Sequence, residues 1–492
     1  MASTKSAPSS FTAAAIFLAL SAGLTAALHL YYLKLPFHWD ELGQFVPAAL
    51  DLYRDGSWVA HSTLPNVHPP AVMAYLALVW RVFGYSIQAA RAAMLAIAAV
   101  GLWLSFLLAV RLGRGAAGAP AFAAALFLAA TPLFYTQSMM VLLDMPAMTL
   151  TVLALLLFLD QRWAWCAAAC TLLALTKETA VTTPAVFGLW LWLRSGKRRE
   201  ALYFVAPLVA LAGWLAVLHH ATGHWLGNAE FAQYNIGYAL HPLQILYSMG
   251  ERLLFLFIKD GRFIGVIALY AGWRLLRGTA WAIAALVAGA QLVVVTLLGG
   301  AVLDRYLLPV LPVLYAAFAT AASAYPESWR RISHGALILA LLIGWFWNPP
   351  FPFQYEDNLA MVDFVRLQES AAGFLEGFAP HERIASMWPF TGAIENPDFG
   401  YVDQPLRTVQ LQSFDLADLE KVDRSSFDVL VVYTRQYPMQ GSWLDVALLD
   451  PLLRRLPGYH PQATPDELTE HGYRSLIGWQ RGRQWIEIFM PR

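Results

Sequence analysis

Two adjacent carboxylates, Asp40 and Glu41, lie in the stretch FHWDELGQF at 37–45, directly after an apolar run at 11–33. A carboxylate held at a membrane surface can accept a proton from an incoming hydroxyl group, as a catalytic base does. Asp40 could also cap a helix, because Asp accepts hydrogen bonds from the first backbone N–H groups of a helix. Glu41 lies about 100° around such a helix from Asp40, and it could either support Asp40 or be solvated surface.

Other ionisable residues collect where predicted membrane segments end: His68, Asp144, Lys177, Glu178 and Arg305. Charged groups at membrane depth are costly, so each of these residues is a candidate for function. Lys, Arg and His side chains can bind a phosphate and stabilise its negative charge as it departs. The set therefore indicates transfer of a group from a lipid phosphate to an acceptor hydroxyl.

Structural roles for the same residues stay open. They are an N-cap for Asp144, a structural hydrogen bond for His68, contact with lipid headgroups for Lys177, and an ion pair with Asp304 or a lipid phosphate for Arg305. Tyr306 could stack on a sugar, although most aromatic residues of a membrane protein belong to its interface belts.

The composition predicts an α-helical protein that crosses a membrane several times. Of 492 residues, 58% are hydrophobic and only 13% are charged, whereas soluble domains carry about 25% charged residues. Lys plus Arg and Asp plus Glu both number 33, so net charge predicts neither a nucleic acid nor a strongly anionic partner. We interpret Cys166 and Cys170 as packing residues, because one helical turn separates them and no zinc spacing is present.

Basic loops orient the membrane spans, because loops rich in Lys and Arg stay in the cytoplasm. Five basic stretches fall on one side if the chain crosses eleven times: 111–115, 160–163, 194–200, 274–278 and 327–333. The predicted spans are 11–33, 88–110, 118–136, 143–159, 163–177, 179–194, 201–220, 261–276, 280–299, 305–322 and 333–348. The N-terminus is then cytoplasmic. If 259–262 were instead a cytoplasmic turn, two crossings would be added and 274–278 would lie outside.

The N-terminal apolar run is longer than the core of a cleaved signal peptide, so we expect it to be retained as a span. Apolar spacing predicts surface helices within 40–56, 68–84 and 241–258. Pro47 indicates a kink or a late start of the first helix, and Pro70 suits the first turn of the second.

The predicted domains are a transmembrane domain at 1–349 and a soluble α/β domain at 350–492 outside the membrane. In the second domain we expect a helix at 355–378, strands at 383–387, 408–411 and 428–434, and a hairpin over 473–490. No internal repeat or low-complexity segment is visible in the sequence.

The layout of the first 350 residues resembles the GT-C glycosyltransferases that use polyprenyl-phosphate sugars. These enzymes include protein O-mannosyltransferases, lipid A aminoarabinose transferases and lipopolysaccharide-core transferases. The matching motifs occur in the family's order and spacing: WDE (39–41), HPP (68–70), LDMPA (143–147), LTKE (175–178) and DRYLLPVLP (304–312). Aminoarabinose transferases carry Lys where His68 stands, and many relatives have Gly in place of Glu178.

The resemblance implies an inverting glycosyltransferase that moves a sugar from a polyprenyl phosphate to an acceptor hydroxyl on the outer face of the inner (plasma) membrane. Its partners would be the lipid-linked donor, a lipid, glycan or protein acceptor, and membrane lipids, but no nucleic acid. Asp40 would be the base, with Glu41 and Asp144 in the catalytic group. The substrate-binding group would be His68, Lys177, Glu178, Arg305 and Tyr306.

We expect no cofactor, and the lack of a nucleotide-binding glycine loop agrees with a donor carried by lipid. The acidic pair could nevertheless hold a divalent metal ion. A transporter or flippase is the main alternative, but transporters place ionisable residues near the midplane and often contain repeated halves. A lipid-bound scaffold with a degenerate site is a third possibility.

Overall fold

The computed structural model describes residues 10–114, 116, 120–347, 356–435 and 462–491. These residues form two compact units. The first comprises the described parts of Met1–Leu33 and Phe45–Trp345, and the second those of Lys34–Gln44 and Phe346–Arg492. The short segment Lys34–Gln44 therefore groups with the end of the chain.

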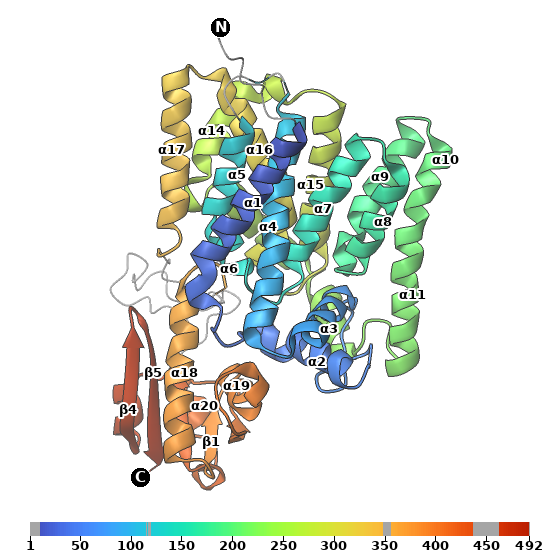
Figure 1. Cartoon of the computed structure of the whole chain (residues 1–492). Coiled ribbons are helices and arrows are strands. Elements are labelled where there is room, and N and C mark those ends of the chain that lie inside the picture. Colours follow the sequence, from blue (N-terminus) through green and yellow to red (C-terminus); the bar gives the residue numbers. More distant parts are fainter. Residues whose placement is uncertain (1–9, 115, 117–119, 348–355, 436–461, 492) are drawn as a thin grey trace. The chain divides into compact units, whose positions relative to one another are not determined.

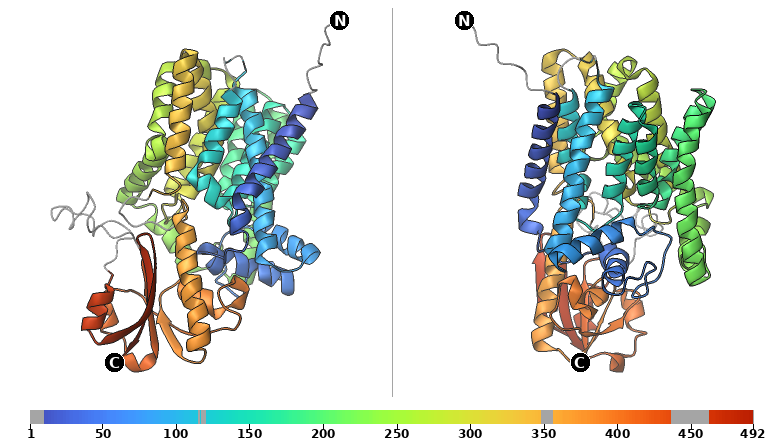
Figure 2. Two further views of the ribbon diagram at one scale, coloured as in Figure 1. Left: turned by 60° about the vertical axis from the view of Figure 1, so that its left-hand side comes forward. Right: turned by 45° about the vertical axis from the view of Figure 1, so that its right-hand side comes forward.

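The first unit is a bundle of helices that run side by side (Figures 1 and 2). The helices at the predicted spans are α1 (Ser10–His29), α4 (Ile87–Leu112), α5 (Pro120–Ala130), α6 (Pro132–Gln137), α7 (Asp144–Leu159), α8 (Trp163–Ala174), α9 (Thr182–Leu193), α10 (Arg198–Ala201), α11 (Val205–Thr222), α14 (Phe263–Gly272), α15 (Thr279–Leu297), η8 (Asp304–Val310), α16 (Leu311–Ala321) and α17 (Glu327–Ile343).

Five helical stretches within the described residues are long and apolar enough to cross a membrane. They are Ala15–Tyr32, Ile87–Leu112, Arg198–Thr222, Thr279–Leu297 and Asp304–Ala324. Shorter apolar helices include α5, α7 and α8. The helical membrane fold is thus confirmed, while the number of eleven crossings stays a prediction.

Close packing against α4 holds α7, the helix that begins at Asp144, in place. A β-carbon at Gly101 of α4 would lie only 2.5 Å from the Thr149 hydroxyl oxygen. The missing side chain therefore lets the two helices approach. The N-terminus of α4 is capped by Ser86, whose Oγ accepts a hydrogen bond from the Ala89 amide at 3.1 Å.

Short helices are present at the three predicted surface positions. They are α2 (Val46–Arg54), preceded by the wide helical turn Glu41–Phe45, α3 (Ala71–Phe83) and α13 (Pro242–Phe257). The late start of α2 confirms the effect expected of Pro47, and Pro70 is the residue before α3. In Figure 1, α2 and α3 lie at the end of the bundle opposite the start of α1.

The second unit contains a five-stranded sheet with the order β2-β1-β3-β5-β4. The strands are β1 (Arg383–Ser386), β2 (Arg407–Gln410), β3 (Val429–Tyr433), β4 (Tyr473–Arg481) and β5 (Gln484–Pro491). Strands β1, β2 and β3 pair in parallel, and β5 pairs antiparallel with β3 and β4. Each predicted strand is confirmed, and Gly482 adopts a positive φ of 57° in the hairpin turn.

Helices cover this sheet and complete the α/β unit. They are α18 (Ala360–Phe378), α19 (Phe390–Glu395), α20 (Leu416–Leu419) and α22 (Pro465–Glu470). Helix α18 confirms the helix predicted at 355–378 from Ala360 onward, whereas 356–359 are not helical and residue 355 is outside the described residues. It packs on β4 and β5. The fully buried strand β3 lies at the centre of the sheet.

Candidate active site

Asp144 joins two cations in the interior of the first unit. It is the first residue of α7 rather than the residue before it, so the N-cap position belongs to Leu143. The Asp144 carboxylate pairs with the Lys177 ammonium group and lies 3.4 Å from the Arg305 Nε. All three residues are at most 5% exposed. Residues from α7, from the loop after α8 and from η8 thus meet in one cluster.

The ring of Tyr306 brings a third cation into this cluster. Its centroid lies 4.0 Å from Lys177 Nζ, 5.7 Å from Arg305 Cζ and 5.9 Å from Arg252 Cζ. Cations are attracted to the negative face of an aromatic ring, and more strongly when water is excluded. We call Asp144, Lys177, Arg252, Arg305 and Tyr306 the cationic cluster.

Arg252 of α13 was not predicted from the sequence. It is 1% exposed, and its guanidinium group donates to the carbonyl oxygens of Val295 at 2.7 Å and Leu303 at 3.4 Å. Its Nε has no hydrogen-bond partner among the described residues. Burial lowers the pKa of Arg252 to about 10, which leaves the side chain protonated at neutral pH.

His68 and Glu178, the residue after Lys177, form a hydrogen-bonded pair. His68 Nδ1 lies 2.9 Å from Glu178 Oε2, and the His68 ring packs against Phe45 and Phe231. Burial alone would raise the pKa of Glu178, but attraction to His68 and Lys177, with hydrogen bonding to His68, outweighs burial and lowers it. The structural hydrogen bond considered for His68 is therefore present.

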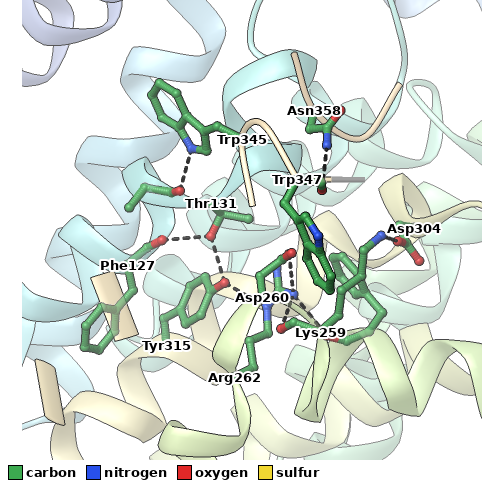
Figure 3. A network of polar contacts seen from close by, with 12 residues as sticks. Phe127, Thr131, Lys259, Asp260, Arg262, Asp304, Tyr315, Trp345, Trp347 and Asn358 are labelled. Atoms are coloured by element: carbon green, nitrogen blue, oxygen red, sulfur yellow. Dashed lines mark hydrogen bonds and ion pairs between the residues drawn. The ribbon is translucent and has the colours of Figure 1, made fainter. Parts of the chain in front are cut away.

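A polar network includes the residue before Arg305 (Figure 3). Asp304, its neighbour in η8, pairs with Lys259 at 2.6 Å. The fully buried Arg262 donates to the Tyr315 hydroxyl at 3.0 Å and to Asp260 at 3.1 Å. Tyr315 and Thr131 share a further hydrogen bond of 2.7 Å. Asp304 thus pairs with Lys259, while Arg305 lies beside Asp144.

Asp40 and Glu41 belong to the second unit. The carboxylate of Glu41 is buried and accepts a hydrogen bond from the His38 amide at 2.7 Å. Asp40 is half-buried, and its Oδ1 lies 3.5 Å from the Gln44 side-chain nitrogen. Glu41 thus closes the turn that carries Asp40, and its role stays a prediction.

A different trio could hold a metal ion among the described residues. The ligand atoms of Asp51, Asp55 and His61 all lie within 4.8 Å of one another. However, Asp51 already accepts hydrogen bonds from the amides of His61 and Ser62, at 2.8 and 3.0 Å. These bonds account for the position of the Asp51 carboxylate within the loop without a metal ion.

The fold and this site define an integral membrane protein with the GT-C fold. The chain belongs to the family described as "Predicted membrane protein (DUF2079)", whose model matches residues 62–372. No curated protein sequence matches it.

Solved structures of ArnT from Cupriavidus metallidurans are similar over nearly the whole chain. The structure bound to undecaprenyl phosphate has a TM-score of 0.56 at 14% identity and covers 98% of each chain. The apo structure has a TM-score of 0.53 at 16% identity, covering 97% of this chain and 98% of ArnT. At these identities the similarity establishes the fold alone, which is the GT-C fold expected from the sequence.

Proposed function

We propose that this protein is an inverting glycosyltransferase that moves a sugar from a polyprenyl phosphate to an acceptor hydroxyl on the outer face of the membrane. The observation that carries the proposal is the cationic cluster. Lys177 and Arg305 are buried beside the Asp144 carboxylate, and the Tyr306 ring lies within 6 Å of these two cations and of the buried Arg252. Buried Lys and Arg side chains form strong charge-assisted hydrogen bonds with phosphate oxygens, so an anionic ligand suits this arrangement.

The charge of the cationic cluster suits the leaving group better than the intact donor. The cluster as defined contains three cations and one carboxylate, and Asp304 of the neighbouring pair also attracts Arg252. A sugar linked to a polyprenyl phosphate is a phosphodiester with one negative charge, whereas the departing phosphate monoester develops a second. Interactions that strengthen toward the transition state are those that accelerate a reaction. The bound undecaprenyl phosphate in ArnT supports the same class of donor.

In the proposed reaction, Asp40 takes the proton of the acceptor hydroxyl as the oxygen attacks the anomeric carbon. The new bond joins acceptor oxygen to sugar, and the bond between the sugar and the phosphate oxygen breaks with its electron pair going to the phosphate. Attack in line with the leaving group inverts the anomeric centre. Asp144 is proposed to orient Lys177 and Arg305, while His68, Glu178 and Tyr306 line the donor site.

The reaction as proposed uses no cofactor. The positive charges of Lys177, Arg252 and Arg305 would stabilise the leaving phosphate as a divalent ion does in other transferases. Chelation with EDTA is therefore expected to leave the transfer rate unchanged, measured against the same enzyme with added magnesium. Loss of activity that magnesium restores would assign the phosphate to a metal ion instead.

The lipids that copurify with the protein test the proposed function. An Asp40→Asn variant should bind donor without consuming it, so mass spectrometry should find a polyprenyl phosphate that still carries its sugar. The wild type should instead carry polyprenyl phosphate without sugar, the product. A flippase would carry the same lipid in both proteins, and bulk phospholipid alone in both would contradict the proposal.

The proposed side of action predicts a labelling pattern. Ser195 lies after α9 and Ser425 in the second unit, and both are exposed. Because basic loops stay in the cytoplasm, a Ser425→Cys variant should react with an impermeant thiol reagent in intact cells. A Ser195→Cys variant should react only after the cells are opened. The native Cys166 and Cys170 are buried, and equal labelling of both variants in intact cells would reject the orientation.

A further inference from the structure

The segment Lys34–Gln44 is packed into the second unit by backbone and aromatic contacts. The Phe37 amide donates to the Phe399 carbonyl at 3.1 Å, and the Tyr401 hydroxyl donates to the Phe37 carbonyl at 2.9 Å. The sequence separation between Phe37 and Tyr401 is 364 residues. The stretch that carries Asp40 is thus part of the second unit.

Trp39, the residue before Asp40, has a strained backbone. Its φ of 52° lies in the left-handed region, which a residue with a bulky side chain rarely adopts. Such a conformation persists only where its surroundings impose it. Because Asp40 follows directly, the backbone direction at Trp39 sets where the Asp40 side chain points.

The surroundings that impose this conformation are aromatic and cationic side chains of the second unit. The Trp39 ring lies 5.1 Å from the Trp388 ring at an angle of 74° and 6.3 Å from the Phe364 ring, centroid to centroid. The Arg435 guanidinium lies 5.4 Å from the Trp39 centroid. Edge-on aromatic pairs and cation–π contacts both have preferred geometries, so they restrict the ring more than simple burial does.

Trp388 contacts the turn that carries Asp40 from a second direction. A β-carbon added to Gly43 would lie 3.2 Å from Trp388 Cζ2, so the indole packs directly against the turn Glu41–Phe45. The Trp388 carbonyl in turn accepts hydrogen bonds from Tyr433, at 2.9 Å, and from Arg435. Tyr433 is the last residue of the central strand β3.

We propose that Trp388 and Arg435 are positioning residues for Asp40, so that the C-terminal domain is part of the catalytic apparatus. The end of β3 holds Trp388, Trp388 and Arg435 hold Trp39 in its left-handed conformation, and Trp39 directs the Asp40 carboxylate. The catalytic consequence rests on the proposed function, because it requires Asp40 to be the base. The contacts that hold the segment 34–44 in the second unit do not depend on the proposed function.

Two glycine substitutions distinguish misplacement of Asp40 from a general loss of stability of the second unit. Gly43→Ala places a methyl group against Trp388, whereas Gly373→Ala adds the same methyl group on α18 of the same unit, where no atom lies within 4 Å. A small misplacement of a catalytic group can lower a rate by about 10²-fold. We expect Gly43→Ala to lower kcat about 10-fold or more with unchanged KM for the donor, and Gly373→Ala to match wild type.

A second substitution that restores kcat, and hydrogen exchange of the segment 34–44, both distinguish a positioning role from a general loss of stability. Because Phe is smaller than Trp, Gly43→Ala/Trp388→Phe should recover part of the kcat lost in Gly43→Ala. In Trp388→Leu, amide exchange should increase in the segment 34–44 but stay unchanged in α18, which reports on the stability of the domain.

The two proposals fail in different ways. Unchanged exchange of 34–44 in Trp388→Leu would overturn the positioning role, whatever the protein catalyses. A kcat of Gly43→Ala equal to that of Gly373→Ala would also overturn it. Wild-type protein that transfers sugar from no undecaprenyl-phosphate donor would overturn the proposed function, while the exchange experiment would still measure the hold on the segment.

Discussion

Replacing Asp40 with Asn is expected to lower the rate of sugar transfer by about 10²–10⁴, the usual effect of removing a general base. The variant should still bind undecaprenyl phosphate with wild-type affinity, because the substitution leaves every residue of the cationic cluster unchanged. Asn has the size of Asp and can accept a hydrogen bond as Asp does, but its amide does not take up a proton near neutral pH. Transfer measured at saturating donor reports this loss as kcat.

Glu41→Gln provides the matched control for this substitution. The Glu41 carboxylate accepts a hydrogen bond from the His38 amide, and the carbonyl oxygen of Gln can accept the same bond. We therefore expect a smaller loss of rate than in Asp40→Asn. If Glu41→Gln were inactive while Asp40→Asn transferred sugar normally, Glu41 would be the base. Full activity of both variants would leave the stretch 37–45 as the start of a helix only.

Replacing Arg252 with Ala is expected to weaken binding of undecaprenyl phosphate by about 10–100-fold, because a buried hydrogen bond to a charged group contributes about 1.5–3 kcal/mol. Of the three cations, Arg252 is the one whose substitution is easiest to interpret. Its hydrogen-bond partners within the described residues are carbonyl oxygens, whereas removing Lys177 or Arg305 takes a direct partner from the buried Asp144. Affinity can be measured by native mass spectrometry of protein in nanodiscs at fixed salt.

Substitutions that keep the charge, and one outside the cationic cluster, serve as controls for the Arg252→Ala measurement. Arg252→Lys keeps the charge but loses the planar fork of donors, so only part of the affinity should return. Arg305→Lys should behave in the same way. Arg274→Ala removes an exposed arginine outside the cluster and should bind as wild type does. Wild-type affinity in Arg252→Ala would exclude this residue from the donor site.

The sequence predicts the elements of this fold well because its strongest physical constraints are local. Membrane spans need long apolar runs, and the alternation in 383–434 and 473–490 indicates strands that the structure contains. The cost of charge at membrane depth also singles out Asp144, Lys177 and Arg305, which the structure brings together as ion pairs. Their catalytic roles stay predictions.

Two features of the structure depend on packing between distant segments and were missed. In the sequence, Arg252 is one polar residue of a predicted amphipathic surface helix. In the structure it is buried near the Tyr306 ring, which makes it part of the cationic cluster. The charge in the otherwise apolar run RLLFLFI, 252–258, is the signal that could have identified it. The grouping of 34–44 with the C-terminal domain has no local signal, since its contacts span more than 300 residues of sequence.

The most direct test of the central claim is to follow the phosphorus of the donor by 31P NMR. Purified protein is incubated with a panel of undecaprenyl-phosphate sugars and with membrane extract as the source of acceptor. The account predicts that, for at least one sugar, the phosphodiester signal converts to a phosphomonoester signal with wild type, and that Asp40→Asn slows the conversion at least about 100-fold. Conversion of no donor, or conversion at the same rate by both proteins, would contradict the account.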